Sequence, residues 1–110
     1  MEGLVKGDVV VLPFPFSDLS ANKRRPALVV AQGEYGDVIL CQITSKSKEK
    51  VNTIELKNKD FQKGRLKITS YVRLRKIFTS DLGLILYRAG KIKKEKIKEV
   101  DNAICRIIKE

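Results

Sequence analysis

The sequence predicts a mainly β domain, a small and strongly curved barrel, with one C-terminal α-helix. Short apolar runs bounded by Gly and Pro recur along the chain up to Tyr87, as is typical of buried strands that are too short to be helices. Beyond Lys93 the apolar residues recur every three or four positions instead, which is the period of one helix face. A chain of 110 residues is large enough for one modest core. We therefore expect a single domain over residues 1–110.

Three strands are predicted in the first half of the chain. Residues 9–12 and 27–31 are short β-branched or aliphatic runs. Gly33 and Gly36 allow a tight connection from the second run into residues 38–43. We expect the last two of these strands to pair as a hairpin.

The middle of the chain is predicted to add a brief strand, a turn and a longer strand. Residues 53–56 form the brief strand, and residues 57–65 form a turn with one short helical turn near Asp60 and Phe61. Apolar and polar residues alternate over residues 66–75, which predicts a strand with one core face and one exposed face. The expected core face comprises Leu66, Ile68, Ser70, Val72 and Leu74, and the exposed face includes Tyr71, Arg73 and Arg75.

The last strand and the helix complete the predicted elements. The strand signal continues through Leu82, Leu84 and Leu86 to Tyr87, and Gly90 is expected to end it. The helix is expected to pack one face on the barrel. That face comprises Ile97, Val100, Ile104, Ile107 and Ile108.

The charge of the chain points to a polyanionic partner. Its 23 Lys and Arg residues against 13 Asp and Glu residues give a net charge of +10. Such an excess gains free energy by neutralising phosphates or carboxylates, so nucleic acid or an acidic protein is the natural partner. The absence of histidine excludes imidazole acid–base catalysis and His-containing metal sites. We expect no metal and no cofactor.

The cysteines and the apolar runs indicate a cytoplasmic protein. Cys41 and Cys105 lie within apolar runs far apart in sequence, which favours buried free thiols over a disulfide. No run approaches the roughly 20 apolar residues of a membrane span, and the first residues lack the pattern of a signal peptide. We therefore expect no membrane association.

Three consecutive cations, Lys23, Arg24 and Arg25, directly precede Pro26 and a strand. A strand edge holds guanidinium groups in place, so they can meet a phosphate or carboxylate with fixed geometry. The sequence therefore predicts an anion site at the start of this strand.

The surrounding motifs resemble those of the MazF/PemK family of toxin endoribonucleases. Members of that family commonly show Gly-Asp before a strand, then Pro-Phe, a polar loop and Arg-Pro-Ala before the next strand. Here these motifs are Gly7-Asp8, Pro13-Phe14 and Arg25-Pro26-Ala27. Ile43-Thr44-Ser45, Ser70-Tyr71-Val72-Arg73 and Lys76-Ile77-Phe78-Thr79 follow in the family's order, so the resemblance spans about residues 5 to 90.

The resemblance implies a fold, an activity and partners. The implied fold is the SH3-like small β-barrel of the MazF, PemK and CcdB type with a C-terminal helix. The implied function is that of a type II toxin, a metal-free, sequence-selective endoribonuclease cleaving single-stranded RNA. An acidic antitoxin protein is the implied inhibitor, and a homodimer is the implied assembly. A toxin that binds a protein target such as gyrase, and a non-catalytic nucleic-acid-binding barrel, are the alternatives.

The resemblance also implies catalytic residues, which are Arg25, Thr44 and Arg73. Arg25 would contact the scissile phosphate, where it stabilises the transition state or protonates the leaving oxygen. Thr44 would donate its hydroxyl to a phosphate oxygen. Some PemK-type members carry an Asp two residues after the Arg at position 73, but Arg75 occupies that position here. The alternatives are that another group such as Asp18 or Asp81 accepts the proton, that turnover relies on arginine electrostatics, or that catalysis is weak.

Further residues are predicted to contact RNA. Arg24 and Arg75 are expected to be general contacts, and Ser45 takes the role of Thr44 if the register slips by one. The expected RNA-binding set comprises Lys23, Arg24, Ser45, Lys46, Lys48 and Arg75. Base stacking is limited by the low aromatic content, with Tyr35, Phe14 and Phe16 as candidates and both Phe favoured as core or interface residues.

Overall fold

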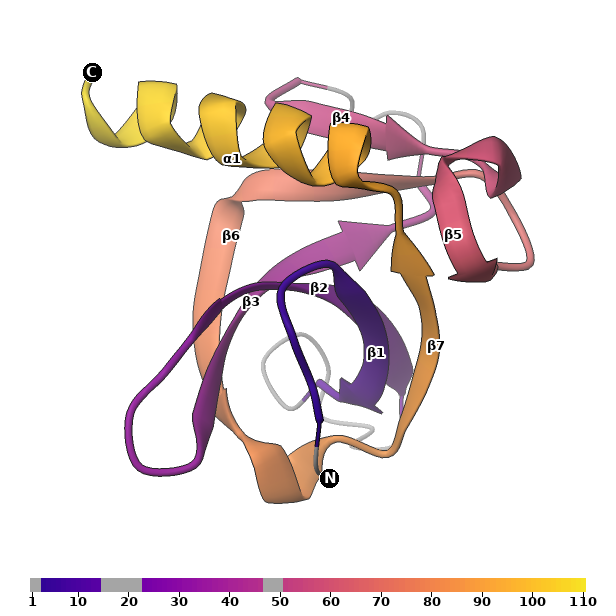
Figure 1. The fold of residues 1–110 in the computed structure, drawn as a ribbon, viewed down its shortest axis with the longest axis vertical. Helices are drawn as coiled ribbons and strands as arrows, with labels where there is room; N and C mark the ends of the chain where they lie inside the picture. Colours follow the sequence, from indigo (N-terminus) through magenta and orange to yellow (C-terminus); the bar gives the residue numbers. More distant parts are fainter. Residues whose placement is uncertain (1–2, 15–22, 47–50) are drawn as a thin grey trace.

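The computed structural model describes residues 3–14, 23–46 and 51–110. Within these residues, seven strands form one sheet that curls into a half-barrel, and one helix follows at the C-terminal end of the chain (Figure 1). The strands are β1 (Asp8–Pro13), β2 (Arg24–Gln32), β3 (Asp37–Thr44), β4 (Thr53–Leu56), β5 (Phe61–Gly64), β6 (Ser70–Asp81) and β7 (Tyr87–Ile92). The mainly β fold with a C-terminal helix confirms the predicted fold class.

The sheet is antiparallel throughout, in the order β4-β6-β3-β2-β1-β7-β5. β2 and β3 pair as the predicted hairpin, with Leu28 opposite Cys41. Their connection uses two residues with positive φ, Tyr35 at 50° and Gly36 at 83°. The order places β2 and β3 near the middle of the sheet. Because they pair antiparallel, the start of β2 lies beside the end of β3.

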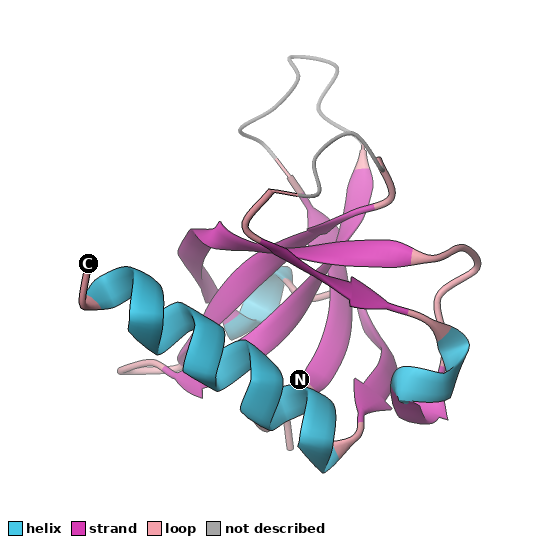
Figure 2. Cartoon of the chain, turned by 90° about the horizontal axis from the view of Figure 1, so that it is seen from above, coloured by secondary structure: helices cyan, strands magenta, loops and turns pink. Residues whose placement is uncertain are grey.

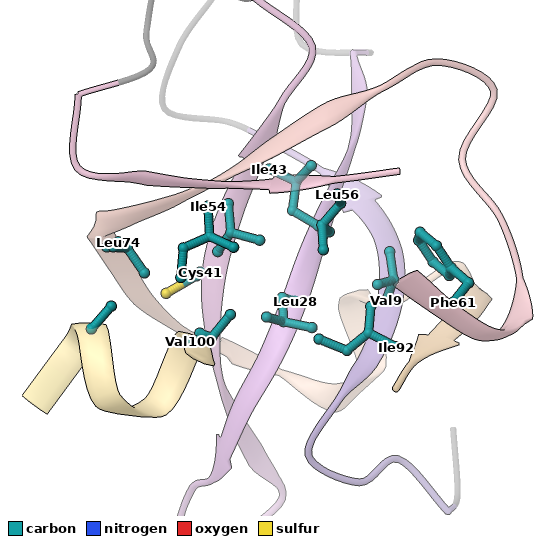
Figure 3. Packing of buried hydrophobic residues seen from close by; sticks show 12 residues of the cluster. Val9, Leu28, Cys41, Ile43, Ile54, Leu56, Phe61, Leu74, Ile92 and Val100 are labelled. Carbon is teal, nitrogen blue, oxygen red and sulfur yellow. The ribbon is translucent and has the colours of Figure 1, made fainter. Parts of the chain in front are cut away.

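Both faces of the central strands are buried. Val9, Leu28 and Cys41 belong to one core cluster, whereas their neighbours Val10 and Val29 belong to a second cluster. Successive residues of a strand point to opposite faces, so the two clusters lie on opposite faces of β1, β2 and β3. Figure 3 shows the first cluster between the sheet and the helix.

The helix α1 (Lys94–Ile108) packs against the first cluster, as its apolar spacing predicts. Figure 2 shows it lying along one side of the curled sheet. Val100 is buried, and Ile97, Ile104 and Ile107 pack against the cluster. The prediction was wrong for Ile108, which is 72% exposed because it ends the helix beyond the edge of the cluster.

The strand predicted over residues 66–75 is displaced toward the C-terminus. β6 begins at Ser70, and Ile68, predicted in the core, is 61% exposed. Tyr71, predicted on an exposed face, is only 8% exposed. It is paired with Thr44 in β3 and with Glu55 in β4, so strands flank it on both sides. Within β6 the predicted core face is confirmed, because Ser70, Val72 and Leu74 are buried, and Tyr71 is the exception on the other face.

The segment predicted as a strand over residues 82–87 forms a different structure. Leu82–Leu84 is a short 3-10 helix, and the Asp81 carboxylate accepts the Gly83 N–H at 2.7 Å to begin it. β7 starts only at Tyr87, and Gly90 lies inside it instead of ending it. Gly90 is paired with Gly64 of β5, a strand within the predicted turn. The predicted helical turn is the 3-10 helix Asn58–Asp60.

The two cysteines lie in different environments. Cys41 is a buried free thiol as predicted, whereas Cys105 is exposed, because it lies on the side of α1 that faces away from the core. Burial raises the pKa of the Cys41 thiol to about 12. Among the described residues, no helix is long and apolar enough to cross a membrane.

We predict that a thiol reagent at neutral pH modifies Cys105 rapidly and Cys41 only after unfolding. The thiolate is the reactive form, and the raised pKa together with burial suppresses it at Cys41. Mass spectrometry of the native and the urea-unfolded protein should show one and two adducts per chain. Two rapid adducts in the native protein would contradict the buried position of Cys41.

Candidate nucleic-acid interface

A groove of about 400 Å³ lies where β2 begins and β3 ends, and the segment before β6 forms another part of its wall. We call it the Arg25 groove. Its lining includes six of the predicted site residues, which are Lys23, Arg24, Arg25, Thr44, Ser45 and Lys46. Segments separated by about twenty residues in the sequence therefore meet here, as the predicted hairpin requires.

The sheet register accounts for this meeting. Leu12 of β1 is paired with Arg25, and Ala27 of β2 is paired with Gln42 of β3. Arg25 and Thr44 lie just beyond this pair on their strands, and both line the Arg25 groove. Residues opposite each other on neighbouring strands share a face, and their strands lie about 5 Å apart. The two residues are therefore held close to each other by the sheet itself.

The Arg25 groove is strongly basic. Lys67 joins Lys23, Arg24, Arg25 and Lys46 in its lining, and none of the described lining residues is acidic. A concave surface with one sign of charge concentrates counter-charged ligands. The groove therefore suits a phosphate backbone.

The Arg25 side chain carries a donor that is suited to binding a ligand. Its side chain is half-buried, and its buried Nε has no hydrogen-bond partner among the described residues. Buried donors are nearly always paired in folded proteins, because an unpaired one costs free energy. An oxygen of a bound anion would satisfy this N–H.

Thr44 is buried, and its Oγ1 accepts the Lys46 N–H at 3.2 Å. This bond turns the chain at the end of β3. A hydroxyl can accept and donate at the same time, so the bond leaves the hydroxyl proton for a second partner. Thr44 can therefore donate to an oxygen in the groove.

Arg73 lies one row farther along the sheet. It is paired with Thr53 of β4, and its Nη1 donates to Gln42 Oε1 at 3.4 Å. Gln42 and Thr44 are two residues apart on β3, so Arg73 is on the face that carries Thr44. Arg73 and Arg75 line a separate groove of about 380 Å³, the Arg73 groove, and not the Arg25 groove. There the Arg75 Nη2 binds both carboxylate oxygens of Glu110 at 2.9 Å.

Other predicted residues lie away from these grooves or outside the described residues. Lys48, Asp18 and Phe16 fall outside the described residues. Asp81 is paired with Asp37, at the other end of β3 from Thr44, which is about 24 Å along a strand. The fully exposed Tyr35 lies at that same end, in the β2–β3 turn. Phe14 is buried, with its ring edge against Phe78 at a centroid distance of 5.2 Å.

The structure adds residues that the sequence did not single out for the site. Lys67 and Ser70 line the Arg25 groove, and the Ser70 hydroxyl donates to the Ile68 carbonyl at 3.0 Å. The alternation pattern had assigned Ser70 to a core face, and the motif that begins at Ser70 carried no expected role for its hydroxyl. Among the described residues, no group of three Cys, Asp or Glu side chains is placed to hold a metal ion.

Fold and groove together define a small, mainly β protein with a strongly basic groove. Residues 5–108 match the family model of PemK-like, MazF-like toxins of type II toxin-antitoxin systems. The chain belongs to this family. The match covers the strands, the Arg25 groove and the helix.

Solved structures share the fold at low sequence identity. MazF from Deinococcus radiodurans is 20% identical with a TM-score of 0.74, over 97% of each chain. An endoribonuclease in complex with its cognate antitoxin, from a mycobacterial species, is 16% identical with a TM-score of 0.73, over 96% of this chain and 95% of that one. Another mycobacterial endoribonuclease is 18% identical with a TM-score of 0.72, over 98% and 93%. No curated protein matches the sequence.

Proposed function

We propose that this toxin is an endoribonuclease that cleaves single-stranded RNA by attack of the RNA's own 2′-hydroxyl. The observation that carries the proposal is the Arg25 groove, in which a basic lining surrounds a buried, unpartnered Arg25 Nε and the Thr44 hydroxyl. Cleavage by an internal nucleophile requires charge stabilisation and proton transfer. The basic side chains that line the groove supply the charge stabilisation.

Different residues of the grooves assist different steps of the cleavage reaction. The 2′-hydroxyl loses its proton and its oxygen bonds to phosphorus, and the bond from phosphorus to the 5′-oxygen then breaks. The leaving oxygen takes up a proton, which leaves a cyclic phosphate on one product and a 5′-hydroxyl on the other. Arg25 and Thr44 donate to the phosphate oxygens, where negative charge grows. Arg73, on the same face but in the Arg73 groove, adds positive charge along the surface that the RNA follows.

Glu55 is the carboxylate that the register offers as proton acceptor. Thr44 is paired with Tyr71, and Tyr71 is paired with Glu55, so the three form one row on one face. The Thr44 and Glu55 backbones are two strand spacings apart, about 10 Å. A phosphodiester bound by Thr44 can therefore present its 2′-hydroxyl toward Glu55. Asp81 lies too far along β3 to do so.

We predict that Glu55→Gln lowers kcat for RNA cleavage by at least about 100-fold and leaves KM nearly unchanged, since a general base typically contributes 10²- to 10⁴-fold. Stability should hold, because the exposed pair of Glu55 and Lys57, at 3.6 Å, contributes little. Glu34→Gln, an exposed position beside the β2–β3 turn, is the matched control. Equal activity of both variants would exclude Glu55 as the base.

The same basic surface indicates which binding partners to propose. We propose a homodimer that binds single-stranded RNA and is inhibited by an acidic antitoxin competing for the basic grooves. The net charge of +10 and the basic lining of the Arg25 groove support this competition. The mycobacterial endoribonuclease of the same fold, solved in complex with its cognate antitoxin, supports an antitoxin as partner.

Incubating the purified protein with a mixed RNA pool, with and without EDTA, tests the proposed function. We expect cleavage of single-stranded RNA in both conditions. Binding of RNA without cleavage would favour a non-catalytic nucleic-acid-binding barrel. Neither cleavage nor binding would favour a toxin with a protein target.

A further inference from the structure

A third groove, of about 440 Å³, adjoins the Arg25 groove. We call it the Tyr87 groove. Four residues line both grooves, which are Arg24, Pro26, Leu66 and Lys67. A ligand in the Arg25 groove can therefore continue into the Tyr87 groove without leaving the protein surface.

The floor of the Tyr87 groove is apolar and contains one aromatic ring. Val11 of β1 is paired with Pro26 on one side and with Tyr87 on the other, so the three residues form a row across the sheet. Pro26 and Tyr87 are two strand spacings apart, about 10 Å. Tyr87 is 49% exposed, and Ala89 lines the groove beside it. A flat apolar surface with a half-exposed ring is what a nucleobase needs for stacking.

The rim of the Tyr87 groove is basic. Arg24, Arg65, Lys67 and Arg88 line it, and none of the described lining residues is acidic. Arg24, Arg65 and Lys67 form no ion pair with any described residue. Their charges are therefore available to phosphates.

Two contacts hold the Arg88 side chain in position. Its Nε lies 3.3 Å from an oxygen of the buried Asp8 carboxylate, and its Nη2 donates to the Gly3 carbonyl at 3.0 Å. Asp8 itself accepts the Val5 N–H at 2.8 Å. Asp8 therefore holds the Arg88 guanidinium on the face of β7 opposite to the Tyr87 ring, and the basic charges open to phosphates in the groove are those of Arg24, Arg65 and Lys67.

We infer that the Tyr87 groove binds a nucleotide of single-stranded RNA that flanks the cleavage site. Its base stacks on the Tyr87 ring over Val11 and Pro26, and its phosphates meet Arg65 and Lys67. The inference rests on the proposed function, in which the Arg25 groove holds the scissile phosphate. It assigns recognition of the flanking nucleotide mainly to β7 and to the segment before β6, which carry none of the residues proposed for catalysis.

Binding of a single-stranded RNA made uncleavable by 2′-O-methyl groups tests the inference. We expect Tyr87→Ala to weaken binding by about 5- to 150-fold, as removal of one stacking platform does, and Tyr87→Phe to bind like the unaltered protein. Tyr35→Ala, a fully exposed tyrosine at the β2–β3 turn, should leave binding unchanged. Equal affinity of Tyr87→Ala and the unaltered protein would overturn the inference.

A charge variant keeps the test decisive if Tyr87→Ala does not fold. Arg65 is exposed and lines the Tyr87 groove but not the Arg25 groove, so Arg65→Glu should weaken RNA binding and reduce its salt dependence. Lys98→Glu on the exposed side of α1 changes the net charge equally and is the matched control. Equal weakening by both variants would show a general charge effect and overturn the inference.

The cleavage assay separates this inference from the proposed function. Absence of cleavage by the unaltered protein counts against the endoribonuclease, whatever the binding results. Cleavage by the unaltered protein with unchanged binding and unchanged cleavage by Tyr87→Ala counts against the Tyr87 groove alone. An acidic peptide that loses affinity for Tyr87→Ala while RNA does not would assign the groove to the antitoxin and also overturn the inference.

Discussion

Replacing Arg25 with alanine is expected to lower the rate of RNA cleavage by about 100- to 1,000-fold. Removing one preorganised donor from a site that stabilises a developing negative charge typically costs this much. Arg25 is the residue of the basic groove whose buried Nε lacks a partner among the described residues. The rate constant at saturating RNA is the quantity to measure, because the lost donor acts on the transition state.

The fold should survive this replacement. The Arg25 side chain is half-buried, and alanine removes a buried donor that gains nothing from the surrounding described residues. The far-ultraviolet circular dichroism spectrum and the melting temperature should therefore match those of the unaltered protein. Arg24→Ala is the matched control, and we expect it to weaken RNA binding with a much smaller effect on the rate constant. A folded Arg25→Ala variant with near-normal cleavage would remove Arg25 from the mechanism.

Replacing Gly90 with alanine is expected to destabilise the fold by about 2 kcal/mol and to lower the melting temperature by about 10 °C. A Cβ at this position would lie 2.5 Å from the Lys63 carbonyl oxygen and 3.0 Å from the Phe61 ring. β5 and β7 approach each other closely here, with Gly64 opposite Gly90. The strands would have to separate, and β5 is an edge strand with few other contacts to hold it.

Gly36→Ala provides the matched control for this prediction. Gly36 has a φ of 83°, but among the described residues other than its two chain neighbours no heavy atom lies within 4 Å of the position of its Cβ. Alanine there is strained by the backbone conformation alone, so we expect a smaller loss of stability, about 1 kcal/mol. Thermal unfolding of the two variants compares a steric clash with backbone strain. Equal melting temperatures would show that the contact between β5 and β7 is not tight in solution.

The parts of the fold that the sequence predicted are those with a strong local pattern. The runs over residues 9–12, 27–31 and 38–43 are strands because their apolar residues fill two cores, one on each face. The helix is amphipathic enough to be recognised from spacing alone. The single-domain prediction remains an expectation from chain length.

The errors in the fold arise where partners distant in sequence decide the structure. β5 is four residues long and is a strand only because β7 pairs with it. Leu82–Leu84 has the apolar content of a strand, but Asp81 and Gly83 begin a helical turn. Tyr71 is covered because β3 and β4 lie on either side of it. No local pattern contains these pairings.

The candidate site could be predicted only in part, for the same reason. The motif at Arg25 and the end of the strand at Thr44 mark two halves of one groove, and the hairpin brings them together. The position of Glu55 opposite Tyr71 depends on the register between β4 and β6, and the Tyr87 groove depends on β7 pairing with β1. Leu66 and Lys67, which line both grooves, belong to no motif.

Cleavage of matched RNA substrates that differ by one 2′-hydroxyl tests the central claim most directly. Once a cut site has been mapped, the nucleotide on its 5′ side can be replaced by its 2′-deoxy form and both RNAs incubated with the toxin in EDTA. The account predicts that the all-ribose RNA yields a 2′,3′-cyclic phosphate end and a 5′-hydroxyl end, and that the substituted RNA still binds but is not cut at that site. Cleavage of the substituted RNA at the same site, with a linear phosphate end, would contradict attack by the RNA's own hydroxyl.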